Sequence, residues 1–228
     1  MLVAPSCTLR FHPAIRGITK IIQGGELGTV SNVIYHSGQY LPDWHTYEKV
    51  SDYYVSNRST GGAREIVPFE LTWITDLFGF PKSVTGIVRK TIDIPGAAEI
   101  DDTYNILMDY NGFIFNLTVD VVSRYATRRL LVNGSAGQLV WNWEDNGLKV
   151  FDPVSQQWET RPYEMLPAQE GYNKNITEGM YIEEIRRFLE AADGKCPFPN
   201  SLDKDKEVLH LLYAAEESYT NAKFVNIS

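Results

Sequence analysis

The sequence lacks the features of a membrane protein, of a disulfide-rich secreted domain and of a nucleic-acid-binding protein. No stretch approaches the ~20 consecutive apolar residues that a membrane-spanning helix needs, and the opening residues do not form a signal peptide. Only two of the 228 residues are cysteines, Cys7 and Cys196, which predicts two reduced thiols. Lysine and arginine number 21 against 29 aspartates and glutamates, and the net charge of −8 opposes binding to phosphate backbones. We therefore expect a cytoplasmic globular protein without a membrane or nucleic-acid partner.

Metal-ligand spacing and a nucleophile turn are also absent from the sequence. The four histidines, at positions 12, 36, 45 and 210, are scattered, and no Cys/His cluster accompanies them. No turn of the kind that exposes a catalytic serine or cysteine is visible. The sequence predicts neither a metal centre nor a Ser-His-Asp or Cys-His catalytic site.

The sequence does contain enough apolar residues for one sizeable core, since 43% of all its residues are hydrophobic and 12% are aromatic. Helical periodicity predicts helices after the Gly61-Gly62 pair and at 13–23, 178–192 and 202–221. Strand patterns occur at 2–7, 27–40, 83–94, 102–110, 113–122, 128–133, 138–143, 148–151, 157–161 and 223–227. Several of these strands are joined by tight turns, and Asn111-Gly112 is the strongest hairpin signal. This pattern indicates one α+β domain over residues 1–228, with a large, predominantly antiparallel open sheet and helices on one face.

The central strands carry many apolar residues at alternate positions. The set comprises Ile106, Met108, Phe113, Phe115, Leu117 and Val119. It is larger than one covered face of a sheet should need. We therefore expect the other face to be available for dimerisation.

The stretch from Ser59 to Gly79, STGGAREIVPFELTWITDLFG, combines a Gly pair with an apolar helix. Pro68 is expected to kink this helix or to set the start of its regular part near Glu65. The helix is too apolar to lie on a surface, yet Glu65 and Glu70 make its first turns too polar for plain core. We expect a buried helix whose first turns open into a pocket.

This stretch resembles the Gly-Gly helix of the family of glucose–fructose oxidoreductase, inositol dehydrogenase and MocA-type dehydrogenases. The family pattern is kept at Gly61, Gly62, Glu70, Leu77, Phe78 and Gly79. Glu65 stands where the first acid of the family is expected. Phe69 replaces the family's histidine and Thr72 replaces its second aspartate. The resemblance assigns proton transfer and substrate contact to those two groups, so an oxidation at this site would need another base.

Nearly the whole chain resembles the C-terminal half of that family. LRFHPAIRGITKIIQGGELGTV is similar to its opening strand and helix, NGSAGQL to one of its strand turns, and residues 180–227 to its terminal two helices. The resemblance implies the substrate-binding and oligomerisation domain of an NAD(P)-dependent oxidoreductase acting on a sugar, sugar nucleotide or polyol. It also implies a homo-oligomer, either a dimer or a tetramer.

The nucleotide-binding half of the family has no counterpart in the sequence. No G-x-G-x-x-G turn follows a strand, since Gly24-Gly25 follows a helix and Gly61-Gly62 stands alone. The family's Glu-Lys-Pro motif, with its catalytic lysine, is missing as well. The resemblance therefore implies NAD or NADP in the full-length enzyme, with no cofactor and no catalysis expected for this chain alone.

Glu65 and Glu70 are the candidate catalytic residues. They are five positions apart on a helix, so their side chains lie about 140° apart around its axis and at most one should face a substrate. The alternative for either one is to neutralise a buried arginine such as Arg64 or Arg10, since buried charges are usually paired. Glu65 is the first choice because it occupies the pocket-facing position of the family.

The segment just past the first strand supplies two candidate substrate-binding residues, Arg10 and His12. The resemblance places that strand end beside the substrate cleft, where an arginine can hold a phosphate or carboxylate bidentately. A salt bridge at a helix start is the alternative role for Arg10.

The irregular segment before the Gly pair supplies further candidates. Its aromatic and polar residues are Tyr40, Trp44, His45, Tyr47, Tyr53 and Tyr54, and Tyr40 and Trp44 are the first choices for substrate binding. Such a loop either covers a substrate or packs on its own small aromatic core. Gly61 and Gly62 would let the backbone approach a ligand, and Tyr172 lies in a Gly-rich polar stretch that could reach the same cleft.

Two other functions compete with the oxidoreductase interpretation. The first is a non-catalytic binding or assembly module that dimerises through its sheet. The second is a sugar hydrolase without cofactor, in which Glu65 and Glu70 would act as the two carboxylates at a separation of about 5 to 9.5 Å.

Overall fold

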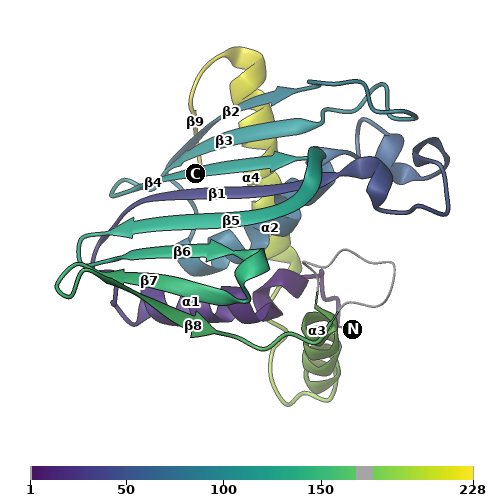
Figure 1. Cartoon of the computed structure of the whole chain (residues 1–228). Coiled ribbons are helices and arrows are strands. Elements are labelled where there is room, and N and C mark those ends of the chain that lie inside the picture. The colour runs from purple at the N-terminus through teal and green to yellow at the C-terminus, as the bar shows by residue number, and fades with distance from the viewer. Residues whose placement is uncertain (1, 168–176, 228) are drawn as a thin grey trace.

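The nine strands of the computed structural model, which describes residues 2–167 and 177–227, form one open sheet (Figure 1). The strands are Val30–Tyr40 (β1), Ser83–Arg89 (β2), Thr103–Asp109 (β3), Ile114–Asp120 (β4), Val122–Gly134 (β5), Gln138–Asn142 (β6), Gly147–Asp152 (β7), Gln157–Pro162 (β8) and Val225–Asn226 (β9). The α-helices are Pro13–Gln23 (α1), Ala63–Phe78 (α2), Glu178–Ala192 (α3) and Leu202–Asn221 (α4). Short 3-10 helices occur at Thr8–Phe11 (η1), Leu41–Asp43 (η2), Val50–Asp52 (η3), Tyr54–Ser56 (η4) and Trp143–Asp145 (η5). The α+β fold expected from the sequence is thus confirmed.

The strand order in the sheet is β8-β7-β6-β5-β1-β4-β3-β2-β9. The runs β2-β3-β4 and β5-β6-β7-β8 are antiparallel, as expected for strands that follow each other through tight turns. The sequence did not predict that β1 lies between β4 and β5, parallel to β4. Parallel pairing needs a long connection, and here α2, β2 and β3 all lie between β1 and β4 in the chain.

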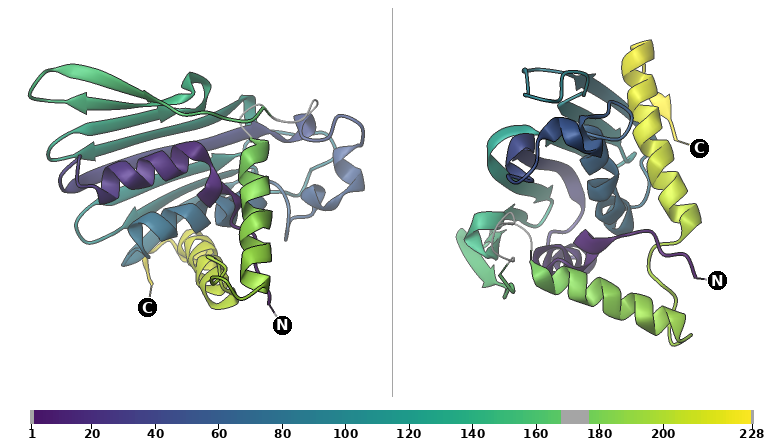
Figure 2. Two further views of the ribbon diagram at one scale, coloured as in Figure 1. Left: turned by 90° about the horizontal axis from the view of Figure 1, so that it is seen from below. Right: turned by 90° about the vertical axis from the view of Figure 1, so that its right-hand side faces the viewer.

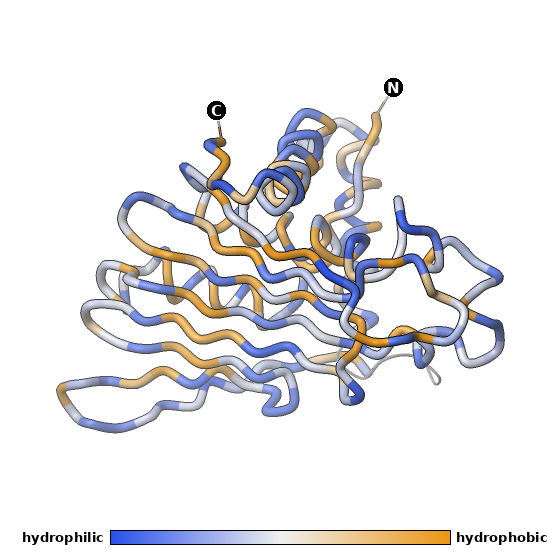
Figure 3. The backbone as a smooth tube through the Cα atoms, turned by 90° about the horizontal axis from the view of Figure 1, so that it is seen from above, coloured by the Kyte–Doolittle hydropathy of each residue, from blue (hydrophilic) through white to orange (hydrophobic). Residues whose placement is uncertain are grey.

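Helices α1, α2 and α4 cover one face of the sheet, as Figure 2 shows from two directions. The alternation of apolar and polar residues along the strands is visible in Figure 3. Of the six apolar residues expected to exceed the needs of one covered face, five are buried on the covered face, namely Ile106, Met108, Phe115, Leu117 and Val119. The sixth, Phe113, is partly buried against the same core. The view that these residues are too many for one covered face was wrong, because the helices on that face cover them.

The open face of the sheet carries a different set of residues. Three isoleucines, Ile34, Ile87 and Ile114, keep 49%, 56% and 51% of their surface exposed. A ladder of amides continues from β1 to β5 and β6, since Gln138 donates to Asn133 at 2.6 Å and Asn133 donates to Asn32 at 2.8 Å. This face is therefore mixed, with apolar residues set among hydrogen-bonded amides.

Residues 2–7 and helix α3 depart from the sequence-based expectation. Residues 2–7 form no strand, because no described strand lies beside them; instead the Glu184 carboxylate of α3 accepts a hydrogen bond from the Cys7 N–H at 2.6 Å. In the apolar stripe of α3, Ile185 and Leu189 are more than half exposed, whereas the ring of Phe188 contacts that of Phe198. None of the helices in the described ranges is both long enough and apolar enough to cross a membrane.

Candidate functional site

The Gly61-Gly62 turn joins the irregular segment of residues 41–60 to α2. Gly62 has a φ of 64°, in the region that favours glycine, and a Cβ there would lie 2.8 Å from the Asp101 carbonyl oxygen. A Cβ at Gly61 would overlap the Val55 backbone. Both glycines are buried against the protein's own backbone. In this structure they allow the loop and the helix to pack closely, and substrate binding by these glycines stays a prediction.

Helix α2 starts at this turn and is continuous from Ala63 to Phe78, with Pro68 inside it. The start expected near Glu65 was thus two residues late. Arg64 points to α4, where its Nε lies 2.6 Å from Glu216. Glu65 lies in the first helical turn, where the N-terminal end of the helix favours a carboxylate.

The Glu65 carboxylate faces the irregular segment. Its Oε1 accepts a hydrogen bond from the hydroxyl of Tyr54. Its Oε2 is buried and has no hydrogen-bond partner among the described residues. Burial raises the pKa of Glu65, while the Tyr54 hydrogen bond and the nearby His45 lower it, and burial prevails. Glu65 thus presents one unused acceptor atom next to the loop.

The aromatic residues of this loop gather beside Glu65. His45 stacks on Tyr53 with ring centroids 4.9 Å apart and on Tyr47 with centroids 5.2 Å apart. Nδ1 of His45 lies 2.6 Å from a carboxylate oxygen of Glu48. The indole Nε1 of Trp44 is buried and, like Oε2 of Glu65, has no hydrogen-bond partner in the described part of the chain. The loop therefore brings stacked rings to the side of α2 that carries an unused acceptor.

Glu70 points in the other direction, into the sheet, and has no exposed surface. Its Oε1 accepts hydrogen bonds from Arg128 at 3.0 Å and Ser37 at 2.7 Å. Its Oε2 accepts from Tyr35 at 2.8 Å and from the Trp73 indole at 3.0 Å. These contacts favour a structural role for Glu70 over the expected catalytic one, because the carboxylate has four protein partners and no accessible surface.

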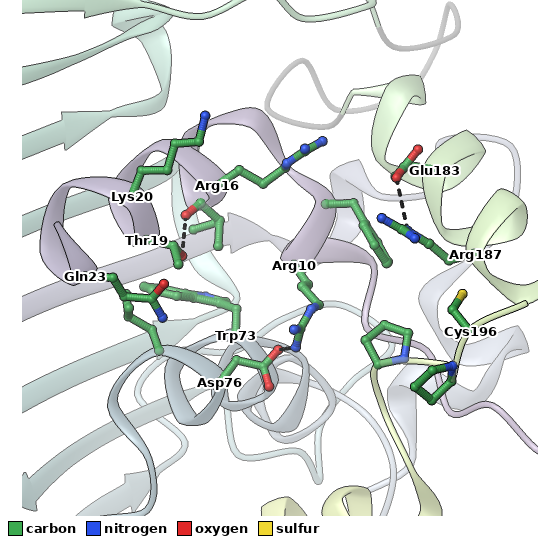
Figure 4. Close-up of a pocket in the computed structure, with 15 residues that line it drawn as sticks. Arg10, Arg16, Thr19, Lys20, Gln23, Trp73, Asp76, Glu183, Arg187 and Cys196 are labelled. Atoms are coloured by element: carbon green, nitrogen blue, oxygen red, sulfur yellow. Dashed lines mark hydrogen bonds and ion pairs between the residues drawn. The ribbon is translucent and has the colours of Figure 1, made fainter. Parts of the chain in front are cut away.

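Arg10 lies at a separate place on the molecule. It forms an ion pair with Asp76, near the end of α2, and Lys204 pairs with the same carboxylate. Arg10 also lines a cavity of about 610 Å³ between α1, the end of α2, α3 and the segment after it (Figure 4). Because Asp76 and Glu65 are 11 residues apart on one helix, they are separated by ~16 Å. The structure therefore does not bring Arg10 to Glu65.

The remaining sequence candidates have local roles. His12 is buried and caps α1, its Nδ1 accepting from the Ala14 N–H at 3.1 Å. Tyr40 ends β1 and carries the guanidinium of Arg124 over its ring, 3.8 Å from the centroid. Tyr172 lies outside the described residues. Within the described residues, no group of three or more His, Cys, Asp or Glu side chains is arranged to hold a metal ion.

The sequence alone did not single out Arg128 as the partner of Glu70. The only available hint was a charged residue in a strand-like segment, and arginines are common at exposed strand positions. His45 and Tyr54 were recognised as members of an aromatic loop, but their position relative to Glu65 depends on how the loop and the Gly-Gly turn fold.

Comparison with known proteins agrees with the fold and gives its family. Residues 15–140 match the family model of the GFO/IDH/MocA C-terminal domain. Among solved structures, an oxidoreductase domain protein from Kribbella flavida is 21% identical, with a TM-score of 0.73, over 97% of this chain and 64% of its own. Levoglucosan dehydrogenase in complex with NADH is 17% identical, with a TM-score of 0.77, over 97% and 64% respectively. An oxidoreductase from Agrobacterium radiobacter in complex with NAD+, L-tartaric acid and magnesium is 14% identical, with a TM-score of 0.78, over 98% and 64%.

The chain thus spans less than two thirds of each of these three structures. No curated protein matches the sequence. The family match covers more than half of the chain, including the Gly-Gly helix and strands β1 to β5. This chain belongs to the GFO/IDH/MocA family of oxidoreductase C-terminal domains.

Proposed function

We propose that this chain is the substrate-binding and oligomerisation part of an NAD(P)-dependent oxidoreductase that acts on a sugar, a sugar nucleotide or a polyol. The observation that carries this proposal is the buried acceptor Oε2 of Glu65, in the first turn of the Gly-Gly helix, which has no partner among the described residues. The loop before the turn holds a buried donor that also lacks a partner there, Nε1 of Trp44. Buried polar atoms are nearly always hydrogen-bonded, so a pair that lacks partners favours a ligand with both hydroxyl donors and acceptors. The neighbouring rings of His45 and Tyr53 add flat apolar faces.

Related structures support a carbohydrate-like ligand. Levoglucosan dehydrogenase has been solved with NADH and levoglucosan, and also with NADH and L-sorbose. Both ligands carry several hydroxyl groups. In this chain, Glu65 would accept from a ligand hydroxyl and the Trp44 indole would donate to a ligand oxygen.

The Gly61-Gly62 turn does not fit the pyrophosphate of a dinucleotide. The loops cradling pyrophosphate need glycines with open space above them, but a Cβ at Gly61 or Gly62 would meet the backbone of Val55 or Asp101. We therefore place NAD or NADP on a part of the enzyme other than these residues. The chain alone should have no oxidoreductase activity.

The open face of the sheet supports the oligomerisation part of the proposal. Ile34 and Ile114 lie on neighbouring strands of that face and are half exposed. Pairing two such faces would bury them and would give a homo-dimer or, with a second interface, a tetramer. A non-catalytic assembly module would share this face, but it does not explain the unpartnered atoms of Glu65 and Trp44.

The two-carboxylate hydrolase is disfavoured by the position of Glu70. Hydrolysis by that mechanism needs two carboxylates that both reach the glycosidic bond. Glu70 is buried in its ion pair with Arg128, so Glu65 has no second carboxylate on its helix at the site.

The two-cysteine composition supports placing the protein in the cytoplasm.

Direct binding of polyols tests the proposed function. The chain is titrated calorimetrically with myo-inositol, D-glucose and levoglucosan, while the Trp44 indole N–H resonance is followed by NMR. We expect at least one of these probes to bind and to shift that resonance. The variant Glu65→Gln is titrated in the same way. Glu207→Gln, an exposed change on α4, is its matched control. Absence of binding by every probe would refute the proposed substrate class.

A further inference from the structure

The cavity beside Arg10 gathers positive charge in a chain that is acidic overall. It has a volume of about 610 Å³ and lies between α1, the end of α2, α3 and the segment after α3 (Figure 4). Two carboxylates and four cations belong to its lining, namely Asp76, Glu183, Arg10, Arg16, Lys20 and Arg187. The whole chain has a net charge of −8, so its composition does not account for this local excess of cations. A cavity lined mainly by cations attracts anions.

The two carboxylates of the cavity already have cationic partners. Asp76 pairs with Arg10 and also with Lys204 of α4. Glu183 pairs with Arg187, four positions further along α3. Both carboxylates are thus occupied by cations other than those that α1 brings to the cavity.

The cations of α1 are Arg16 and Lys20, which lie one helical turn apart and are exposed. Figure 4 shows both side chains rising from α1 at one side of the cavity. Neither side chain forms a hydrogen bond or an ion pair with another residue in the part of the chain that the structure describes. A phosphate monoester carries nearly two negative charges at neutral pH and three strong acceptor oxygens. Two unpaired cations on one helix face match such a dianion.

Much of the remaining lining is apolar. Its residues are Phe11, Ile15, Trp73, Leu77, Pro197 and Pro199. The volume is within the ~300–1,000 Å³ that is typical of small-molecule pockets, which combine apolar walls with a few polar groups. Inorganic phosphate would leave these walls uncovered, so the cavity favours an anion with an organic part.

We propose that this cavity is a second binding site, which takes a phosphate monoester with an apolar organic group. The phosphate binds Arg16 and Lys20, and the organic group packs on the wall that includes Trp73. This site is distinct from the one at Glu65, because Asp76 and Glu65 are 11 residues apart on α2 and hence separated by ~16 Å. The inference goes beyond the proposed function and does not depend on it.

Phenyl phosphate tests the inference, because it joins a phosphate monoester to an apolar ring. The chain is titrated calorimetrically with phenyl phosphate, inorganic phosphate and phenol. We expect phenyl phosphate to bind more tightly than the other two and to lose affinity as salt is added. The double variant Arg16→Gln/Lys20→Gln should bind it about tenfold more weakly or worse, since hydrogen bonds from two charged groups are lost. In NMR spectra of the wild type, phenyl phosphate should shift the indole N–H resonance of Trp73 and leave that of Trp44 in place.

Lys49→Gln/Lys206→Gln is the matched control, because it removes two exposed lysines outside the cavity and changes the net charge equally. It should bind phenyl phosphate like the wild type. The inference would be overturned by a wild type that does not bind phenyl phosphate, or by equal affinities in the two double variants. Inorganic phosphate that binds as tightly as phenyl phosphate would overturn the organic part of the assignment.

Arg16 and Lys20 are exposed, so their replacement should leave the fold intact, and circular dichroism checks this. Polyol binding at Glu65 should be the same in Arg16→Gln/Lys20→Gln as in the wild type. A chain that binds phenyl phosphate but no polyol would refute the proposed function and support this inference.

Discussion

Glu65 and Glu70 lie on one helix and have opposite environments. Glu65 faces a loop, keeps one unpartnered oxygen and has its pKa raised by burial. Glu70 faces the sheet and is surrounded by donors, including the guanidinium of Arg128. A buried carboxylate that pairs with a cation stabilises the fold, whereas a desolvated carboxylate without a cation is available to a ligand.

Glu65→Gln should separate affinity from stability. Glutamine preserves an acceptor for Tyr54 but removes the charge, so we expect polyol affinity to fall by about tenfold. The raised pKa means that ionised Glu65 disfavours folding, and this cost is present above the folded-state pKa and absent below the unfolded value near 4.5. The variant should therefore melt at the wild-type temperature or higher at pH 7, with the difference vanishing below pH 4.5. A large drop in melting temperature with unchanged affinity would show that Glu65 is structural.

Glu70→Gln should have the opposite effect. It leaves the Arg128 guanidinium buried without its counter-charge, and we expect the free energy of unfolding to fall by about 3 to 5 kcal/mol. The double variant Glu70→Met/Arg128→Met should recover much of this loss, since it removes both charges. Urea denaturation measures both variants. A Glu70→Gln protein as stable as the wild type would contradict the structural role assigned to the pair.

At the scale of elements, the Gly-Gly turn positions the aromatic loop against α2. Gly61 N–H donates to the Asn57 carbonyl at 2.7 Å and Gly62 N–H to the Val55 carbonyl at 3.0 Å. These bonds bring the backbone of the Gly pair so close to the backbone at Val55 that a Cβ on Gly61 would not fit between them. The same turn therefore explains both the start of the helix and the position of the loop beside Glu65.

Gly61→Ala should destabilise the protein and loosen the site. Its Cβ would overlap the Val55 backbone, and overpacking of this kind costs about 1 to 3 kcal/mol. Gly112→Ala is the control, since a Cβ in that hairpin turn meets nothing within 4 Å. Thermal melts and the Trp44 indole N–H resonance are the measurements. A Gly61→Ala protein with the melting temperature of Gly112→Ala would refute the packing role of the turn.

For the whole molecule, the open face of the sheet should mediate self-association. We expect sedimentation at tens of micromolar to show a dimer or larger particle, because three half-exposed isoleucines occupy that face. Ile34→Lys should shift the particle toward monomer, since it places a charge at the centre of the contact. Val154→Lys, in the turn between β7 and β8, is the control, because Val154 is 92% exposed. A wild-type monomer at this concentration would contradict the prediction.

The 228-residue chain should not bind NAD(H) or NADP(H) at micromolar concentrations. The reason is the missing glycine fingerprint together with the filled space above Gly61 and Gly62. Calorimetric titration with each dinucleotide is the measurement. Micromolar binding would mean that the described residues form a nucleotide site of another kind.

The sequence was most informative where structure depends on neighbouring residues. The bounds predicted for α1, α3 and α4 match the structure, and the Asn111-Gly112 hairpin joins β3 to β4 as expected. Amphipathic spacing, helix caps and turn residues are local properties, so a single sequence records them. The resemblance of the Gly-Gly helix to an oxidoreductase family was likewise carried by residues close together in the chain.

Only the tertiary structure decided which face and which partner each residue has. It inserted β1 between β4 and β5, sent Glu70 to Arg128 and placed His45 beside Glu65. It also showed that Ile185 and Leu189 of the apolar stripe of α3 are exposed and do not join the core. Such pairings join residues that are 20 to more than 80 positions apart. Periodicity predicts which face of a helix or strand is buried, but the partner on that face depends on how distant segments pack.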